Sequence, residues 1–271
     1  MYKLVAIDLD GTLLTDELAI TPRTIQAIQK AVELGTVVTI ATGRMFPSAK
    51  QFAQQLEIDV PVITYQGAII KNIADNEVLY ERLIPADIAQ QLVDIANEKD
   101  LHLQVYQDDI LYGALENDKL IAYSKKSKVP YKVEPDLGKL ANRGFTKALF
   151  IEGSDNLDRL QDELRALFGE RAHISKSAVN YLEVTHPEAN KGSALLHLAS
   201  KLGIDRSETI GIGDNHNDIE LIKTAGLGVV MGNGVQALKE IADYISLSNN
   251  EEGVCHVIEK FILEPMGVII E

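Results

Sequence analysis

Short apolar runs alternate with amphipathic segments in the first third of the chain. β-branched, apolar runs at 3–7, 37–41 and 62–65 predict buried strands. Residues with helical spacing separate them, and Thr21-Pro22 and Gly35 mark the two ends of the first helix. Strands that alternate with helices predict a parallel sheet.

The same alternation returns in the last third of the chain. Helical spacing and apolar runs there predict three helices, at 191–202, 218–224 and 235–242, and three strands, at 209–212, 227–231 and 244–247. The stretch between the two blocks has another pattern, with predicted helices at 87–98 and 157–168 and predicted strands at 101–106, 110–114, 147–151, around 174 and at 182–184. The expected fold is therefore α/β: a Rossmann-like doubly wound parallel sheet core, residues 1–82 and 187–271, with an inserted α+β domain, residues 83–186.

Composition narrows the choice of partners. The formal net charge of −14, from 26 basic and 40 acidic residues, repels nucleic acids and anionic membranes, so we expect neither as a partner. A small phosphorylated metabolite would be repelled as well. A site for one therefore needs a bound cation and nearby Lys or Arg to reverse the local sign.

Two further features concern the compartment. Cys255 is the single cysteine, and apolar neighbours at helical spacing predict a buried thiol without a disulfide. Asp8 and Asp10 interrupt the N-terminal apolar run, and no other run approaches the roughly 18 residues that span a bilayer. We expect a soluble cytoplasmic protein, monomeric or weakly homo-oligomeric.

Three polar segments, at 8–12, 42–44 and 213–218, directly follow predicted strands. Ligands of open parallel sheets bind at the carboxyl ends of the strands, so these segments are expected to converge. Asp8 and Asp10 repel each other by roughly 1–4 kcal/mol if they project from one side of the chain. With Asp214 and Asp218 they form an oxygen-only group that suits Mg²⁺.

Each segment alone also has a plain structural interpretation. An isolated Asp-x-Asp is more often a turn, and Thr42-Gly43 can be a helix approach. Lys191 at a helix start is usually solvated, and Arg44 can be a surface cation. As functional groups, the Thr42 hydroxyl and the Gly43 amide can hold phosphate oxygens, while Lys191 supplies positive charge.

The segment 211–218 superficially suggests a dinucleotide site. That interpretation fails, because His216 stands where the third glycine is required. No second histidine stands at ligand spacing, so His216 is expected to be an exposed residue at a helix start. The other histidines have no predicted role.

Together these segments resemble the haloacid dehalogenase superfamily, most closely its Cof-type branch of sugar-phosphate phosphatases, over the whole chain. The four matching motifs, in order, are Asp8-Leu9-Asp10-Gly11-Thr12, Thr42-Gly43-Arg44, Lys191-Gly192, and Gly213-Asp214 with Asn217-Asp218. The inserted α+β block has the place and size of the large cap domain of that branch.

The resemblance implies a role for each matching residue. Asp8 would be the nucleophile that forms an aspartyl-phosphate, and Asp10 would be the general acid and base. The Mg²⁺ ligands would be Asp8, the backbone carbonyl of Asp10, and Asp214. Asp218 would support Lys191 or a metal-bound water. The groups that bind phosphoryl oxygens would be the Leu9 amide, Thr42, Gly43, Lys191 and Asn217.

One departure and two alternatives remain. Gln66, in Tyr65-Gln66-Gly67-Ala68, stands where that branch usually shows Asn-Gly-Ala. The resemblance implies an Mg²⁺-dependent phosphatase of small phosphorylated metabolites, sugar phosphates or similar phosphomonoesters. A phosphotransferase or phosphomutase on the same scaffold, and a non-catalytic phosphate sensor, are the alternatives. Asp10 disfavours the sensor, because binding alone needs no general acid.

Overall fold

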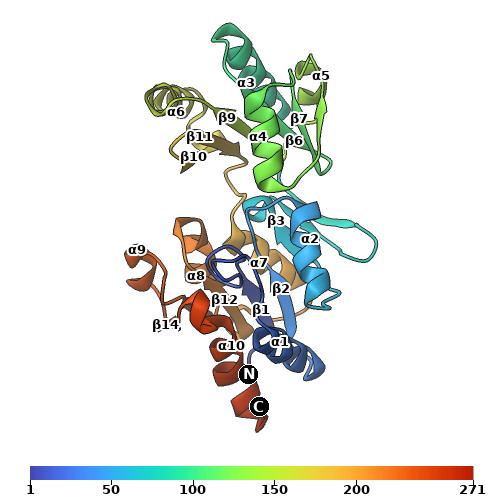
Figure 1. Cartoon of the computed structure of the whole chain (residues 1–271), viewed down its shortest axis with the longest axis vertical. Coiled ribbons are helices and arrows are strands. Elements are labelled where there is room, and N and C mark those ends of the chain that lie inside the picture. Colours follow the sequence, from blue (N-terminus) through green and yellow to red (C-terminus); the bar gives the residue numbers. More distant parts are fainter. Residues whose placement is uncertain (271) are drawn as a thin grey trace. The chain divides into compact units, whose positions relative to one another are not determined.

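The computed structural model describes residues 1–270 and forms two compact units (Figure 1). The first, which we call the core unit, consists of Met1–Tyr80 together with the described residues from Asn190 onward. The second, the inserted unit, is Glu81–Ala189. The sequence pattern puts the corresponding boundaries at 82/83 and 186/187.

The core unit is built on a five-stranded parallel sheet with the order β14-β13-β12-β1-β2. These strands are β1 (Leu4–Ile7), β2 (Val37–Ile40), β12 (Thr209–Gly213), β13 (Leu227–Val230) and β14 (Tyr244–Ile245). The chain leaves β1 for β2 on one side and later returns to β12 on the other. The carboxyl ends of β1 and β12 therefore flank the point where the strand order reverses. The predicted doubly wound parallel core is confirmed.

Helices cover both faces of this sheet. They are α1 (Pro22–Glu33), α2 (Phe46–Gln55), α7 (Lys191–Lys201), α8 (Ile219–Thr224), α9 (Gln236–Lys239) and α10 (Gly253–Ile258). Leu4 and Ala6 of β1 pack with α7 and α8 in one apolar cluster. Val5 and Ile7 alternate with them and are buried on the opposite face. Figure 1 shows α10 beside α1, near the N-terminus.

The α1 start follows the sequence signal closely. The Thr21 side chain accepts a hydrogen bond from the Thr24 amide, and Pro22 is the first helical residue. The missing N–H of proline is harmless there, because the first amides of a helix have no partner within the helix.

The third predicted strand differs from expectation. β3 (Val62–Thr64) pairs antiparallel with β4 (Ile69–Lys71), and β5 (Val78–Glu81) completes a separate sheet with the order β3-β4-β5. A single parallel bridge, Ala41 to Ile63, joins β3 to the end of β2. The turn Tyr65–Gly67 reverses the chain through left-handed backbone conformations, so the run after it pairs back on β3.

The inserted unit contains a six-stranded mixed sheet with the order β10-β11-β9-β6-β7-β8. Its strands are β6 (Leu103–Gln107), β7 (Ile110–Gly113), β8 (Tyr131–Val133), β9 (Lys147–Ile151), β10 (His173–Ala178) and β11 (Tyr181–Thr185). Residues of α3 (Ala86–Glu98) and α6 (Ser154–Phe168) form one apolar core with Phe145 and Phe150. The predicted inserted α+β architecture is confirmed.

The sequence pattern did not predict three elements of the inserted unit: α4 (Asp118–Ser127), α5 (Gly138–Ala141) and β8. Leu120 is the one fully enclosed side chain of α4, so apolar periodicity is weak there. α5 and β8 span few residues and give no periodic signal of their own.

The last helical segments of the chain belong to the core unit. After α10 the helix continues as a π-helical segment, Glu259–Leu263, and a final helical turn, Glu264–Met266. Ile262 and Leu263 are buried. Within residues 1–270, every helix is too short or too polar to cross a bilayer.

The reactivity of the Cys255 thiol tests the packing of α10. The Cys255 side chain is fully enclosed, and burial, followed by the nearby Glu259 carboxylate, raises the pKa of the thiol to about 12. We expect the native protein at about pH 8 to be inert towards a chromogenic aromatic disulfide, and one thiol to react after unfolding. A Val179→Cys variant is the control, since Val179 is 72% exposed and its cysteine should react at once. Rapid reaction of native Cys255 would contradict this packing.

Candidate functional site

Asp8 lies directly after β1, inside a closed turn. The Asp8 amide donates to the Ile212 carbonyl at 3.0 Å and so continues the ladder with β12. The Leu13 amide donates to the Asp8 carbonyl and the Leu14 amide to the Leu9 carbonyl, at 3.1 and 2.9 Å. Gly11 supplies the positive φ of 79° that this turn requires. The Asp8 side chain is therefore buried at the carboxyl end of the strand.

Lys191 joins two of the predicted carboxylates. It is the first residue of α7 and is fully buried, and its Nζ lies 2.6 Å from Oδ1 of Asp8 and 2.6 Å from Oδ1 of Asp218. The second oxygen of Asp218 accepts the backbone N–H groups of Asp214 and Asn215 at 3.0 and 3.1 Å. Asp218 thus ties the lysine to the turn that follows β12.

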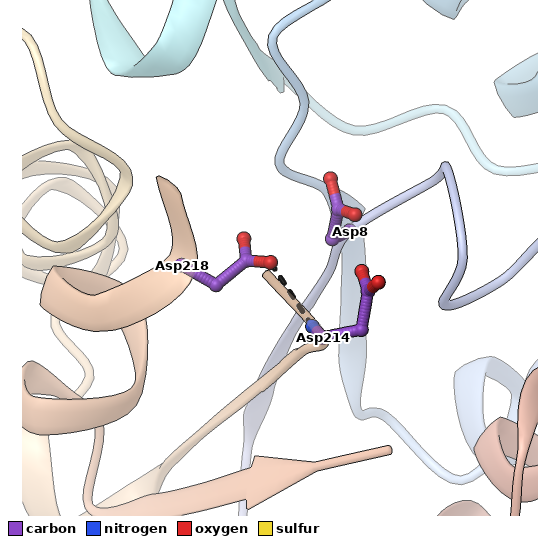
Figure 2. Close-up of side chains that lie close together, drawn as sticks. All are labelled: Asp8, Asp214 and Asp218. Carbon is purple, nitrogen blue, oxygen red and sulfur yellow. Dashed lines mark hydrogen bonds between the residues drawn. The ribbon is translucent and has the colours of Figure 1, made fainter. Parts of the chain in front are cut away.

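Asp214 completes an acidic cluster. Figure 2 shows the side chains of Asp8, Asp214 and Asp218 gathered around one space, and an oxygen of each lies within 4.8 Å of the others. The Thr12 hydroxyl donates to Oδ1 of Asp214 at 3.0 Å. A Cβ on Gly11 would stand 2.5 Å from Oδ2 of Asp214, so only glycine leaves room for this carboxylate.

The electrostatics of the cluster call for a further positive charge. Burial raises the pKa of Asp8 well above its ordinary value against the opposing attraction of Lys191, and Asp218 raises it further. Burial and then Asp218 raise the pKa of Asp214 to about 6. Burial alone would lower the pKa of Lys191, but the carboxylates of Asp218 and Asp8 outweigh burial and raise it. One ammonium therefore faces three carboxylates.

The donor set fits a hard cation. All three side chains offer oxygen, and oxygen ligands suit Mg²⁺ or Ca²⁺ rather than a soft metal. Both oxygens of Asp218 are already engaged, by Lys191 and by two amides. Asp8 and Asp214 are thus the better candidates for direct ligands, and Asp218 supports Lys191.

Asp10 has a cation of its own. Nε and one terminal nitrogen of Arg44 lie 2.8 and 2.5 Å from the two carboxylate oxygens of Asp10. The Arg44 guanidinium also stands 5.0 Å from the centre of the Phe52 ring. The two aspartates of the first motif are therefore held by different cations, and Arg44, whose role the sequence left open, orients Asp10.

The second and fourth motifs meet at Gln66. Thr42 is buried, and its hydroxyl oxygen accepts the Arg44 amide at 3.1 Å. Nδ2 of Asn217 donates to Oε1 of Gln66 at 3.1 Å, and a Cβ on Gly43 would lie 2.3 Å from Nε2 of Gln66. The sequence marked Gln66 only as a departure. The Gln-Gly pair directly after an apolar strand was the available signal.

His216 has no part in the cluster. It is exposed and opens the short turn His216–Asp218, as the sequence predicted. Within residues 1–270, Asp8, Asp214 and Asp218 form the one group of His, Cys, Asp or Glu side chains with metal-ligand geometry.

Known proteins share this fold. A family model described as haloacid dehalogenase-like hydrolase matches residues 5–258, so the chain belongs to the haloacid dehalogenase-like hydrolases. The HMP-PP phosphatase of Serratia proteamaculans is 32% identical over 269 residues, which cover 98% of this chain and 97% of that protein. Within the family the chain is a Cof-type phosphatase, a phosphoric monoester hydrolase, and the predicted resemblance and enzyme class are confirmed.

Two further relatives match over nearly the whole chain. The 5-amino-6-(5-phospho-D-ribitylamino)uracil phosphatase of Bacillus subtilis is 29% identical over 263 residues, which cover 95% of this chain and 97% of that protein. An X-ray structure of a Thermotoga maritima protein superposes with a TM-score of 0.89 at 34% identity, covering 96% of this chain and 98% of that one.

Replacing Lys191 tests the buried ion cluster. Lys191→Met keeps most of the side-chain volume but leaves Asp8 and Asp218 buried without their ammonium. We expect the free energy of unfolding in metal-free buffer to fall by roughly 3–5 kcal/mol, measured by urea titration. Lys201→Met, at the exposed far end of α7, is the matched control and should change it little. Equal unfolding midpoints for the two variants would contradict a stabilising role of Lys191.

Proposed function

We propose that this chain is an Mg²⁺-dependent phosphatase that hydrolyses small phosphorylated metabolites through an aspartyl-phosphate on Asp8. The observation that carries the proposal is the buried Asp8 carboxylate at the end of β1, bonded to Lys191 and surrounded by Asp214 and Asp218. A carboxylate nucleophile must approach an anionic phosphoryl group. The local ammonium and an oxygen-ligated cation make that approach favourable in an acidic protein.

The proposed Mg²⁺ ligands are Asp8, Asp214 and the backbone carbonyl of Asp10. When bound, Mg²⁺ supplies positive charge to the phosphoryl oxygens and so makes the phosphorus more electrophilic. The Thr12 hydroxyl orients the Asp214 carboxylate for this task by donating to Oδ1.

The remaining groups bind the phosphoryl oxygens. They are the Thr42 hydroxyl, the backbone amides of Leu9 and Gly43, the Lys191 ammonium and the Asn217 amide. Asp218 holds Lys191 in place through Oδ1 and holds the 214–215 turn through Oδ2. An Asp8 oxygen attacks phosphorus, and the bond from phosphorus to the leaving oxygen breaks.

Asp10 acts as general acid and then as general base. It donates a proton to the leaving oxygen and afterwards takes one from the water that hydrolyses the aspartyl-phosphate. Its carboxylate is half-exposed, so water can reach it, and Arg44 orients it through two bonds. A sensor without catalysis would need no such group.

The substrate is proposed by class. Two relatives of 29% and 32% identity carry names that specify different phosphorylated compounds. We therefore propose a small phosphomonoester, such as a sugar phosphate, and place the choice of leaving group outside the groups that bind the phosphoryl oxygens.

Asp8→Asn tests the nucleophile. The change is nearly isosteric and removes the attacking carboxylate, so Mg²⁺-dependent hydrolysis of p-nitrophenyl phosphate should fall by roughly a factor of 10³ or more. Asp59→Asn, at an exposed position, is the control and should keep wild-type turnover. Unchanged turnover in Asp8→Asn would exclude this mechanism. Faster phosphoryl transfer to a sugar acceptor than to water would indicate a phosphotransferase.

The pKa of Asp214 predicts a pH-dependent metal effect. Without metal the pKa of Asp214 is about 6, above the ordinary 3.8, so the folded chain binds this proton more tightly than the unfolded chain does. The stability that the bound proton contributes is therefore lost as the pH rises from about 3.8 through about 6. Mg²⁺ binds the ionised form. We expect Mg²⁺ to raise the melting temperature at about pH 7.5 but little at about pH 5. Asp214→Asn should lose the effect, and an equal shift at both pH values would contradict this assignment.

A further inference from the structure

The turn after β3 has an unusual backbone. Tyr65, Gln66 and Gly67 have positive φ angles of 52°, 60° and 98°. Only glycine adopts this region freely, because a Cβ crowds the following carbonyl in the left-handed conformation. Two side-chain-bearing residues held there in succession indicate that the surroundings impose the conformation.

Those surroundings are two of the proposed phosphoryl-binding motifs. The Tyr65 amide donates to the Arg44 carbonyl at 3.0 Å, and the Gln66 amide donates to the Thr42 carbonyl at 3.1 Å. Gly67 lies against the backbone that precedes Lys191, where a Cβ would stand 2.2 Å from the Asn190 carbonyl oxygen. The backbone of Gln66 therefore has a fixed position beside both motifs.

The Gln66 side chain reaches a third motif. Its Oε1 accepts Nδ2 of Asn217 at 3.1 Å, and its amide group lies across Gly43, where a Cβ would stand 2.3 Å from Nε2 and 2.8 Å from Cδ. Asn217 is exposed, so without this bond its side chain would sample several rotamers.

We propose that Gln66 is a positioning residue that fixes the Asn217 amide for binding of the phosphoryl group. By accepting one Nδ2 hydrogen, Gln66 orients the second N–H of the same group. The absence of a side chain at Gly43 is what lets the Gln66 amide lie across it. The inference deepens the proposed function and rests on it, since it presumes that Asn217 contacts phosphoryl oxygens.

A double-mutant cycle tests the proposal. Gln66→Met keeps the length of the side chain but removes the acceptor. Gln66→Met and Asn217→Ala should each weaken binding of inorganic phosphate in the presence of Mg²⁺ by about 3–10-fold, the range expected for one hydrogen bond. The double variant should be no weaker than Asn217→Ala alone. In kinetics the loss should appear in KM rather than kcat, because the contact already exists in the bound ground state.

A matched control and an independent variant sharpen the test. Gln55→Met, at the exposed end of α2, should leave phosphate binding and turnover unchanged. Gly43→Ala should push the Gln66 amide aside and break the same bond, so it should lose a similar factor by itself and little more in the Gln66→Met background. If Gln66→Met fails to fold, Gly43→Ala combined with Asn217→Ala decides the matter, because that double variant should be no weaker than Asn217→Ala alone.

The positioning role would be overturned if Gln66→Met bound phosphate as tightly as the wild type. It would also be overturned if the losses of phosphate affinity in Gln66→Met and Asn217→Ala multiplied in the double variant. Failure of the proposed function would look different. Turnover would then persist in Asp8→Asn, whereas calorimetric binding of phosphate to the Gln66 variants does not depend on hydrolysis.

Discussion

The buried ammonium of Lys191 is the constraint on which the site depends. Enclosing a charged group is costly unless opposite charges and hydrogen bonds surround it closely. Asp8 and Asp218 meet that condition, although they stand 183 and 27 residues away in sequence. The start of α7, the end of β1 and the turn after β12 must therefore come together before the lysine can be buried. The proposed catalytic arrangement is in this sense also a structural one.

Lys191 does not complete the charge balance. The three carboxylates of the cluster outnumber it. Burial first, and then the neighbouring charge of Asp218, raise the pKa values of Asp8 and Asp214. An acidic chain that acts on phosphate esters needs a local region of positive potential. The buried Lys191 supplies part of that region, and the oxygen-ligated cation that we propose would supply the rest. Arg44 belongs to a separate pair, and its contribution is the orientation of Asp10.

The sequence predicted the sheet and the acidic cluster because both follow from local rules. Apolar runs identify β1 and β12, and parallel pairing brings the polar residues that follow them to one edge. Other features depend on tertiary contacts. The short strand β4 follows a left-handed turn, and α4 encloses only Leu120, so neither gives a periodic signal. The pairing of Arg44 with Asp10 joins side chains from different loops, which no spacing rule reveals.

The proposed roles of the core residues would also explain why relatives of this chain carry names with different substrates. Asp8, Lys191, Thr42 and Asn217 are all proposed to act on the phosphoryl group and none on the leaving group, so the same core serves any phosphomonoester. Two relatives that are 29% and 32% identical to this chain carry names with different substrates, which fits this separation. Gln66 is a special case, because it contacts the proposed phosphoryl-binding residues from a turn that the four motifs do not include. We propose that a change there alters how tightly phosphate is held, and that selection among leaving groups comes from residues beyond the cluster.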